Sequence, residues 1–137
     1  MAFELVLIHE QDISIPFTCS ESVAIPKGTL LELSDPMTVA KVTGGAPLII
    51  GVAAEAKIAG DGNTKIPVYM RGIFKATSGG GISIGDGLIG ENGTNELLTS
   101  TAAADEVEVC GIALEAATDG QTFLFYLNVG IGGSPET

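Results

Sequence analysis

The chain has 137 residues, of which 45% are hydrophobic, so it is long enough for one domain with its own core and is not a disordered segment. Its net charge is −11: all six basic residues lie between Lys27 and Lys75, and residues 76–137 hold nine acidic residues and no base. A protein binds nucleic acid by neutralising phosphates with cations, so this charge argues against nucleic acid and anionic membranes as partners. No apolar run approaches the ~18 residues of a membrane span, and the start of the chain lacks the basic region of a signal peptide. We therefore expect a soluble, non-secreted domain.

The first segment, Phe3 to Ile8, is apolar except for Glu4. It predicts either a buried strand or an arm that pairs with something outside the domain. We expect three parts in the chain: an N-terminal arm or strand over 1–20, a β-barrel domain over 21–130, and a flexible Gly- and Pro-containing tail over 131–137.

The middle of the chain alternates short β-rich segments with turns. Pro26-Lys27-Gly28 precedes one such segment, Asp35-Pro36 precedes the next, and Gly44 to Pro47 precedes a third. Turn signals recur every eight to twelve residues, and glycine reaches 19 of 137, about twice the usual ~7%. This pattern predicts an all-β protein, a compact barrel or sandwich of about ten short strands. At most one short helical turn is expected, around Ala102–Ala104.

One short sequence pattern occurs twice in the chain. Gly51-Val52-Ala53 is followed by Asp61-Gly62 and a β-rich segment ending at Gly72, and Gly111-Ile112-Ala113 is followed by Asp119-Gly120 and a segment ending at Gly130. The glycines are 60 positions apart and the Asp-Gly pairs 58, so the spacing changes in the loop, where length changes are tolerated. The segment 82–89 likewise echoes 25–31. We predict a duplicated hairpin within two duplicated halves.

The two cysteines, Cys19 and Cys110, show no metal-ligand spacing. Two free thiols fit a chain kept in a reducing compartment, and a single disulfide between them is the alternative.

Two matches to catalytic motifs lack their structural context. Gly81–Gly85 fits G-x-S-x-G, but that motif needs a following helix and a later histidine, and the single histidine is His9. Gly85–Gly90 fits G-x-G-x-x-G, but a polar turn follows where the dinucleotide fingerprint needs a helix.

Other polar groups give no stronger signal. Asp86, Glu91, Asn92, Asn95 and Glu96 could gather round calcium in one loop, but their spacing fits neither an EF-hand nor a nonapeptide calcium repeat. His9 beside Glu10 is expected to be a solvated strand-end histidine. With no supported nucleophile–base pair, we expect no enzyme, no cofactor and no metal.

The phrases of the two halves resemble the small capsid decoration, or cement, proteins of tailed bacteriophages and related viruses. The resemblance rests on Gly51–Ala53 with Asp61-Gly62 and 66–74, on Ile84–Leu88, and on Cys110–Ala117 with 123–127, and it spans roughly residues 22–130. It implies a β-rich, tulip-like barrel without enzymatic activity that binds the outer face of an icosahedral capsid and stabilises it. It further implies the major capsid protein as partner, a homotrimer on three-fold or quasi-three-fold sites, and synthesis in the host cytoplasm.

Candidate contact residues for a capsid follow from the apolar first segment and the basic residues. The first segment would complete a sheet of the capsid protein through its exposed backbone, and the bases would face an acidic capsid patch. The candidates are Phe3, Leu5, Leu7, Ile8, Lys57, Lys65, Arg71 and Lys75.

Two other functions remain open from the residues. A small β module that binds a ligand or carbohydrate is the first, although no Trp and only two Tyr leave little for stacking on sugars. A hairpin domain carrying lipoyl or biotin on a lysine is the second, and Lys57 in Ala56-Lys57-Ile58 fits that pattern poorly.

Overall fold

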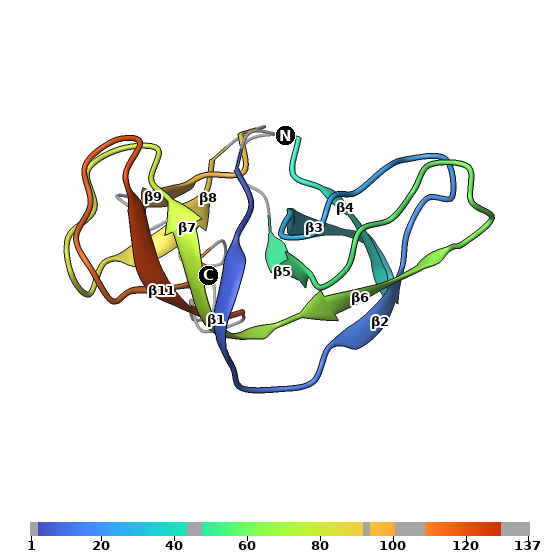
Figure 1. Ribbon diagram of the computed structural model, residues 1–137, viewed down its shortest axis with the longest axis horizontal. Coiled ribbons are helices and arrows are strands. Elements are labelled where there is room, and N and C mark those ends of the chain that lie inside the picture. Colours follow the sequence, from blue (N-terminus) through green and yellow to red (C-terminus); the bar gives the residue numbers. More distant parts are fainter. Residues whose placement is uncertain (1–2, 44–47, 92–93, 101–108, 130–137) are drawn as a thin grey trace, which may run out of the picture.

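The computed structural model describes residues 3–43, 48–91, 94–100 and 109–129, and the regular structure in those ranges is β throughout (Figure 1). This confirms the all-β prediction. The strands are β1 (Val6–Glu10), β2 (Ile15–Thr18), β3 (Leu30–Asp35), β4 (Thr38–Lys41), β5 (Ile49–Ala53), β6 (Lys65–Tyr69), β7 (Arg71–Thr77), β8 (Gly87–Gly90), β9 (Leu97–Thr99), β10 (Gly111–Ala113) and β11 (Thr122–Asn128). The helical turn predicted at Ala102–Ala104 and the tail predicted over 131–137 lie outside the described residues.

The first half of the fold, β2 to β6, is a closed barrel with strand order β2-β4-β3-β5-β6. Alternate residues of its strands point inward, as the period of two in a strand requires. Their side chains form the barrel core with Cys19, Ile25 and Ala53, and the largest are Phe17, Leu31, Val39, Ile66 and Val68.

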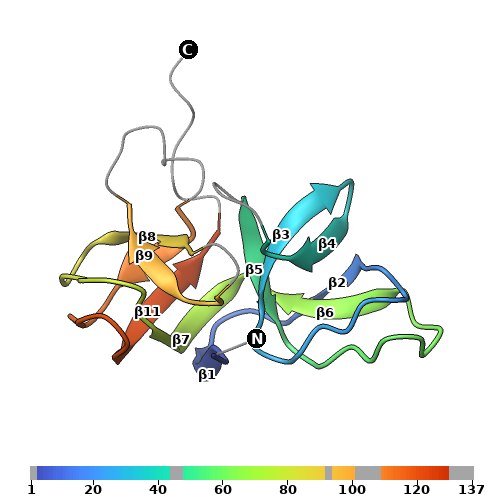
Figure 2. The same cartoon turned by 90° about the horizontal axis from the view of Figure 1, so that it is seen from above.

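The second half, β7 to β11, repeats this arrangement in a rolled sheet of order β7-β11-β10-β8-β9. The last strand returns to the first through a parallel bridge between Ser78 and Leu97, which matches the parallel pairing of Thr18 with Thr38 in the barrel. Figure 2 shows the two halves side by side, joined where β6 runs into β7. The predicted duplication of the halves is confirmed at the level of strand order.

The repeated glycines explain why the two hairpins share a sequence. A Cβ on Gly51 would lie 2.3 Å from the backbone oxygen of Tyr69, and one on Gly111 would lie 2.2 Å from that of Tyr126. Both positions therefore require glycine for the close approach of two backbones. The preceding turns also match, because Gly28 and Gly85 take positive φ angles of 81° and 88°.

Strand β1 extends the sheet of the second half, although it precedes the barrel in sequence. It pairs antiparallel with β7, from Val6 opposite Lys75 to Glu10 opposite Gly72, with a register shift between Leu7 and His9. The first segment is thus a strand of the chain's own sheet. Within the described residues β1 pairs with β7 alone, so it is the terminal strand of that sheet.

The buried hydrophobic side chains form two clusters, whereas the length of the chain predicts a single core. The barrel core is the smaller. The larger fills the second half around Phe74, Phe123 and Phe125 and includes Leu30 and Val52 of the barrel. Burying each such side chain contributes roughly 1.5–3 kcal/mol. Because the second cluster takes residues from both halves, the halves form one packed unit.

Asn95 joins three segments that are distant in sequence. Its Oδ1 accepts a hydrogen bond from the backbone N–H of Leu30 at 2.7 Å. Its Nδ2 donates to the carbonyl of Gly28 at 3.0 Å and to the carbonyl of Phe3. The residue is 7% exposed and has a φ of 64°, a left-handed conformation that asparagine tolerates. Asn95 therefore ties the second half to the barrel and to the N-terminal segment.

Candidate functional site

The four apolar candidates of the first segment differ in accessibility. Leu5 is buried in the larger core and Leu7 packs against it. Phe3 and Ile8 are exposed, as is Val6, which is not among the residues expected from the sequence. Leu5 is therefore a core residue and not a surface contact, because the side chain already packs inside this chain.

Lys57 is also unavailable to a partner. It is 4% exposed, and its Nζ donates to the carbonyls of Glu21 at 3.0 Å and Ile58 at 2.8 Å and to Oδ1 of Asp61 at 2.7 Å. All three ammonium donors are thus satisfied inside one loop. The hydrogen bond from Lys57 holds the pKa of Asp61 below its ordinary value, and the N–H of Asn63 acts in the same direction. Lys57 is a structural lysine of the barrel, and its burial leaves no free amine for lipoyl or biotin.

The other three basic candidates lie on the surface, on two different halves. Lys65 begins β6 of the barrel and donates to Oγ1 of Thr18 at 3.0 Å. Arg71 and Lys75 lie on β7, and Lys75 is exposed opposite Val6 of β1. The structure therefore brings Lys75 beside the exposed part of the first segment and leaves Lys65 apart on the barrel.

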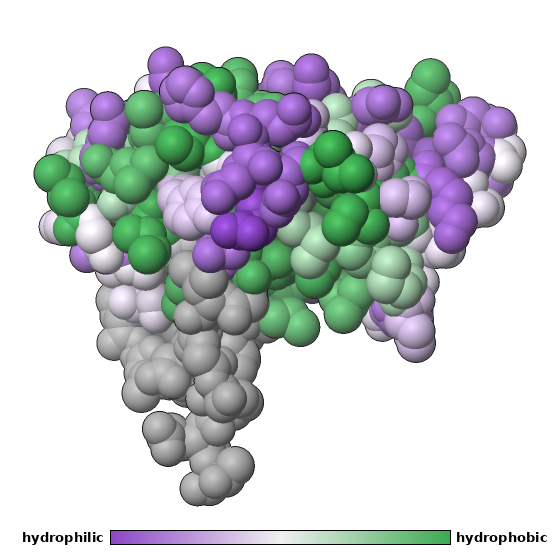
Figure 3. Space-filling view, turned by 90° about the horizontal axis from the view of Figure 1, so that it is seen from below, coloured by the Kyte–Doolittle hydropathy of each residue, from purple (hydrophilic) through white to green (hydrophobic). Residues whose placement is uncertain are grey.

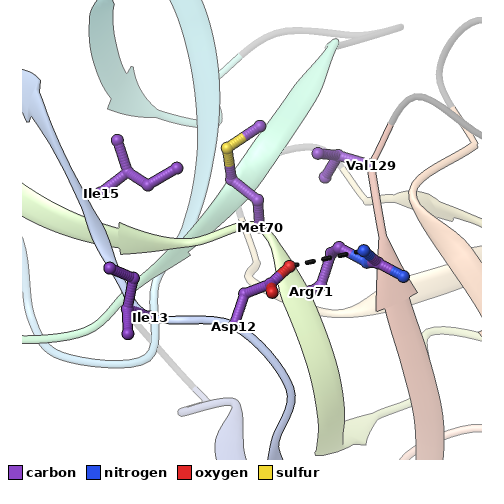
Figure 4. A pocket seen from close by; sticks show the side chains of 6 residues that line it. All are labelled: Asp12, Ile13, Ile15, Met70, Arg71 and Val129. Atoms are coloured by element: carbon purple, nitrogen blue, oxygen red, sulfur yellow. Dashed lines mark ion pairs between the residues drawn. The ribbon is translucent and has the colours of Figure 1, made fainter.

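A groove of about 350 Å³ lies where the two halves meet, and Figure 4 shows its lining. Ile13, Ile15 and Met70 form its apolar part on the barrel side, and Val129 lies on the side of the second half. An ion pair borders it, with Nη1 of Arg71 3.5 Å from Oδ2 of Asp12. Figure 3 views the molecule from below and shows apolar residues gathered just to the right of centre, beside a hydrophilic strip.

Arg71 is held in place by a second contact. Its Nη2 donates to the hydroxyl of Tyr126 at 3.1 Å, and this hydrogen bond is the main reason that the pKa of Arg71 is raised. Its Nε is buried and has no hydrogen-bond partner among the residues that the structure describes. Contacts to Tyr126 of β11 and to Asp12 therefore fix the guanidinium beside the groove.

Sequence reasoning missed the groove because its residues come from distant parts of the chain. Ile13 and Ile15 show strand-like alternation, and nothing local indicates that their side chains stay at the surface. The only hint of the groove in the sequence is that several large apolar residues lie at the ends of expected strands. Strand order is needed to see that those ends meet.

The cysteines are free and lie in different cores, Cys19 in the barrel and Cys110 in the larger cluster. Burial raises the pKa of both thiols, that of Cys110 to about 12. The alternative of a disulfide between them is therefore wrong for this structure.

The two motif matches lie in turns that lead into strand β8. The N–H of Ser83 donates to Oδ2 of Asp86 at 2.8 Å, and Gly87–Gly90 is β8 itself. His9 lies in β1 opposite Ile73. Neither motif precedes a helix, so the context that its chemistry needs is missing.

Two side chains of the calcium pattern interact with other protein groups. Asn95 uses its side chain on backbone groups, and Glu96 has a raised pKa, first through burial and then through a hydrogen bond with Glu91. Asn92 lies outside the described residues. In the described ranges no three His, Cys, Asp or Glu side chains gather as metal ligands. Those ranges also contain no helix that could cross a membrane.

Comparison with known proteins gives three findings. The chain is similar in fold to the N base of the head fiber protein gp8.5 of bacteriophage phi29, with a TM-score of 0.57 and 18% identity over 90% of this chain and 98% of that one. No curated protein matches the sequence. The family model described as phage cement protein matches residues 8–128, which include both halves of the fold and most of β1. The chain therefore belongs to the phage cement protein family.

Proposed function

We propose that this cement protein binds the outer surface of an icosahedral phage capsid, contacts the major capsid protein and stabilises the shell. It would be made in the host cytoplasm and bind as a homotrimer on three-fold or quasi-three-fold sites. Membership of the phage cement protein family supports the capsid as its place of action.

The main support for how the protein binds the capsid is that β1 is the terminal strand of its sheet. The edge of β1 opposite β7 has no partner strand within the described residues. Such an edge presents backbone N–H and C=O groups that can accept a strand of another protein. Phe3, Val6 and Ile8 are exposed along this segment, and Lys75 lies beside Val6 on β7. We name Phe3, Val6, Ile8 and Lys75 the β1 strip and assign capsid contact to it.

Stabilisation would follow from mass action. A protein that binds the expanded shell more tightly than a burst or unexpanded one shifts the equilibrium toward the expanded shell, by an amount that grows with its concentration relative to Kd. Because a shell offers many identical sites, a modest affinity at each is sufficient.

The test is co-sedimentation of the purified protein with expanded empty capsids, followed by thermal disruption of the loaded shells. We expect saturable binding and a higher disruption temperature. Absence of co-sedimentation at any protein concentration would refute the proposal.

The assignment of the β1 strip is tested by Ile8→Glu together with Lys75→Glu. This variant should co-sediment at least tenfold more weakly, since it places two carboxylates on the contact. Ile58→Glu is the matched control, because Ile58 is exposed on a barrel loop remote from β1. Equal binding by both variants would contradict the assignment. Deleting β1 is a poor test, because Leu5 beside it belongs to the core.

A further inference from the structure

The groove where the two halves meet leaves large apolar side chains in contact with water. Ile13 is 81% exposed and Ile15 is 40% exposed. Figure 4 shows the half-buried Met70 with Ile15 on one side and Val129 on the other. Apolar surface gathered in one place is unfavourable in water and commonly marks a contact. The question is therefore what covers the groove.

The described part of the chain ends at this groove. Strand β11 pairs with β7 as far as Asn128, which lies opposite Arg71. The N–H of Val129 then donates to the carbonyl of Met70 at 3.3 Å, and Val129 itself lines the groove. Residues 130–137, here called the last segment, lie outside the described residues and follow directly from this point.

The pairing of the barrel strands prevents the last segment from lengthening β11. Next to β7 along the chain is β6, and both edges of β6 already have partners. Residues of β2 pair with one edge, as Ile15 does with Val68, and residues of β5 pair with the other, as Val52 does with Tyr69. A ladder continued past Val129 would need an edge that is already held. The chain has therefore to leave the sheet there and pass over one of its faces.

The sequence of the last segment suits such a turn. It reads Gly130-Ile131-Gly132-Gly133-Ser134-Pro135-Glu136-Thr137, and Ile131 is its one large apolar residue. Glycine adopts backbone conformations that other residues resist, so the chain can bend sharply on either side of Ile131. Two residues span up to about 7 Å, whereas neighbouring strands lie about 4.8 Å apart. Ile131 can thus lie over Met70 with its side chain against Ile15.

Covering the groove in this way buries no charge. The single charged residue of the last segment, Glu136, is separated from Ile131 by four residues. The charged residues of the groove, Asp12 and Arg71, pair with each other at 3.5 Å. An isoleucine between glycines therefore fills the apolar part of the groove without leaving a charged group unpaired.

We infer that the last segment docks into the groove of its own chain, with Ile131 packed against Ile15 and Met70. A short connection holds a tethered group at a concentration of about millimolar, so the segment has an advantage over any separate molecule. A partner that uses the groove has first to displace Ile131. The inference does not depend on capsid binding, and the protein alone is sufficient to test it.

The first experiment traps the docked segment with a disulfide in the 137-residue chain. The variant with Ile15→Cys and Ile131→Cys should form a disulfide within one chain on mild oxidation. The wild-type thiols do not compete, because Cys19 and Cys110 are buried.

The matched control combines Ile131→Cys with Ile112→Cys. Ile112 is 39% exposed, against 40% for Ile15. It lies opposite Tyr126, three residues before Val129, so an undocked segment would reach it as well. Docking predicts that the disulfide to position 15 forms at least about tenfold faster than the disulfide to position 112, because docking raises the local concentration of one thiol beside the other.

Two outcomes of this experiment overturn the inference. Equal rates for the two variants would mean that the segment does not dock. A disulfide that joins two chains, seen as a doubled mass without reductant, would mean that a second copy occupies the groove.

A second measurement leaves the side chains of the groove unchanged. Ile131→Ser should let dilute hydrogen peroxide oxidise Met70 several-fold faster than in the wild type, because a docked segment shields the sulfur. Met37 is the internal control, since it is 55% exposed in the turn between β3 and β4 and should be oxidised equally in both proteins. An unchanged rate at Met70, measured by mass spectrometry of its peptide, also overturns the inference.

Discussion

Replacing Asn95 by aspartate should weaken the junction of the two halves, because its side chain joins three segments. The substitution keeps the shape, the acceptor for the N–H of Leu30 and the tolerance of a positive φ. It removes the two N–H donors that satisfy the carbonyls of Gly28 and Phe3 and turns a carboxylate oxygen toward them.

The carbonyl of Gly28 keeps the N–H of Leu5 as a donor at 3.0 Å, whereas the carbonyl of Phe3 loses its side-chain donor. Leaving a buried acceptor without its donor costs about 1–3 kcal/mol, so Asn95→Asp should lower the free energy of unfolding by about 1–3 kcal/mol at pH 7. Urea denaturation followed by circular dichroism measures this difference. The loss should shrink at lower pH, because protonation of the introduced carboxyl returns one donor.

The matched control is Asn63→Asp. Asn63 is exposed and uses its Oδ1 as an acceptor from the N–H of Lys65, which aspartate can also provide. This change should alter stability by less than about 0.5 kcal/mol. If Asn95→Asp were as mild as Asn63→Asp, the view that Asn95 fastens the two halves through buried hydrogen bonds would be wrong.

Four further predictions test the contacts inside the two halves. Gly111→Ala should lower stability by about 3 kcal/mol or more in urea denaturation, because its Cβ would clash with a backbone oxygen, whereas Gly81→Ala, with no atom within 4 Å, should be nearly neutral. Lys57→Met should cost about 1–3 kcal/mol by the same assay, because the carbonyls of Glu21 and Ile58 and the carboxylate of Asp61 lose the ammonium donor. The pKa of Asp61 is lowered in the folded state, so its contribution is present above the unfolded value of about 3.9 and lost as pH falls through the folded value. The stability difference between wild type and Asp61→Asn should accordingly vanish in acid, and a difference independent of pH would contradict the Lys57 contact. Cys110, with a pKa raised to about 12, should resist thiol reagents at pH 8 until the protein unfolds.

The local sequence predicts structure at positions where the backbone conformation permits only one type of residue. Gly51 and Gly111 are fixed by the approach of a neighbouring strand, and Gly28 and Gly85 by a positive φ, so the repeat of these glycines marks the two hairpins in the sequence itself. The same reasoning failed for Lys57. Its charge predicted a surface contact, and only the folded loop shows three acceptors converging on its ammonium group.

The sequence by itself determined that this chain is a β protein of two similar halves, because alternation, turn residues and obligatory glycines depend on neighbours along the chain. Tertiary structure alone decided which of two matching apolar positions is buried. Val52 and Ile112 are both apolar residues at the same place in their hairpins, yet one is buried and the other exposed. Likewise, nothing in the sequence of Phe3–Ile8 indicates that this segment leads into a strand that pairs with β7 of the second half. Burial is a property of what packs against a residue, and in this fold the packing partners are distant in sequence.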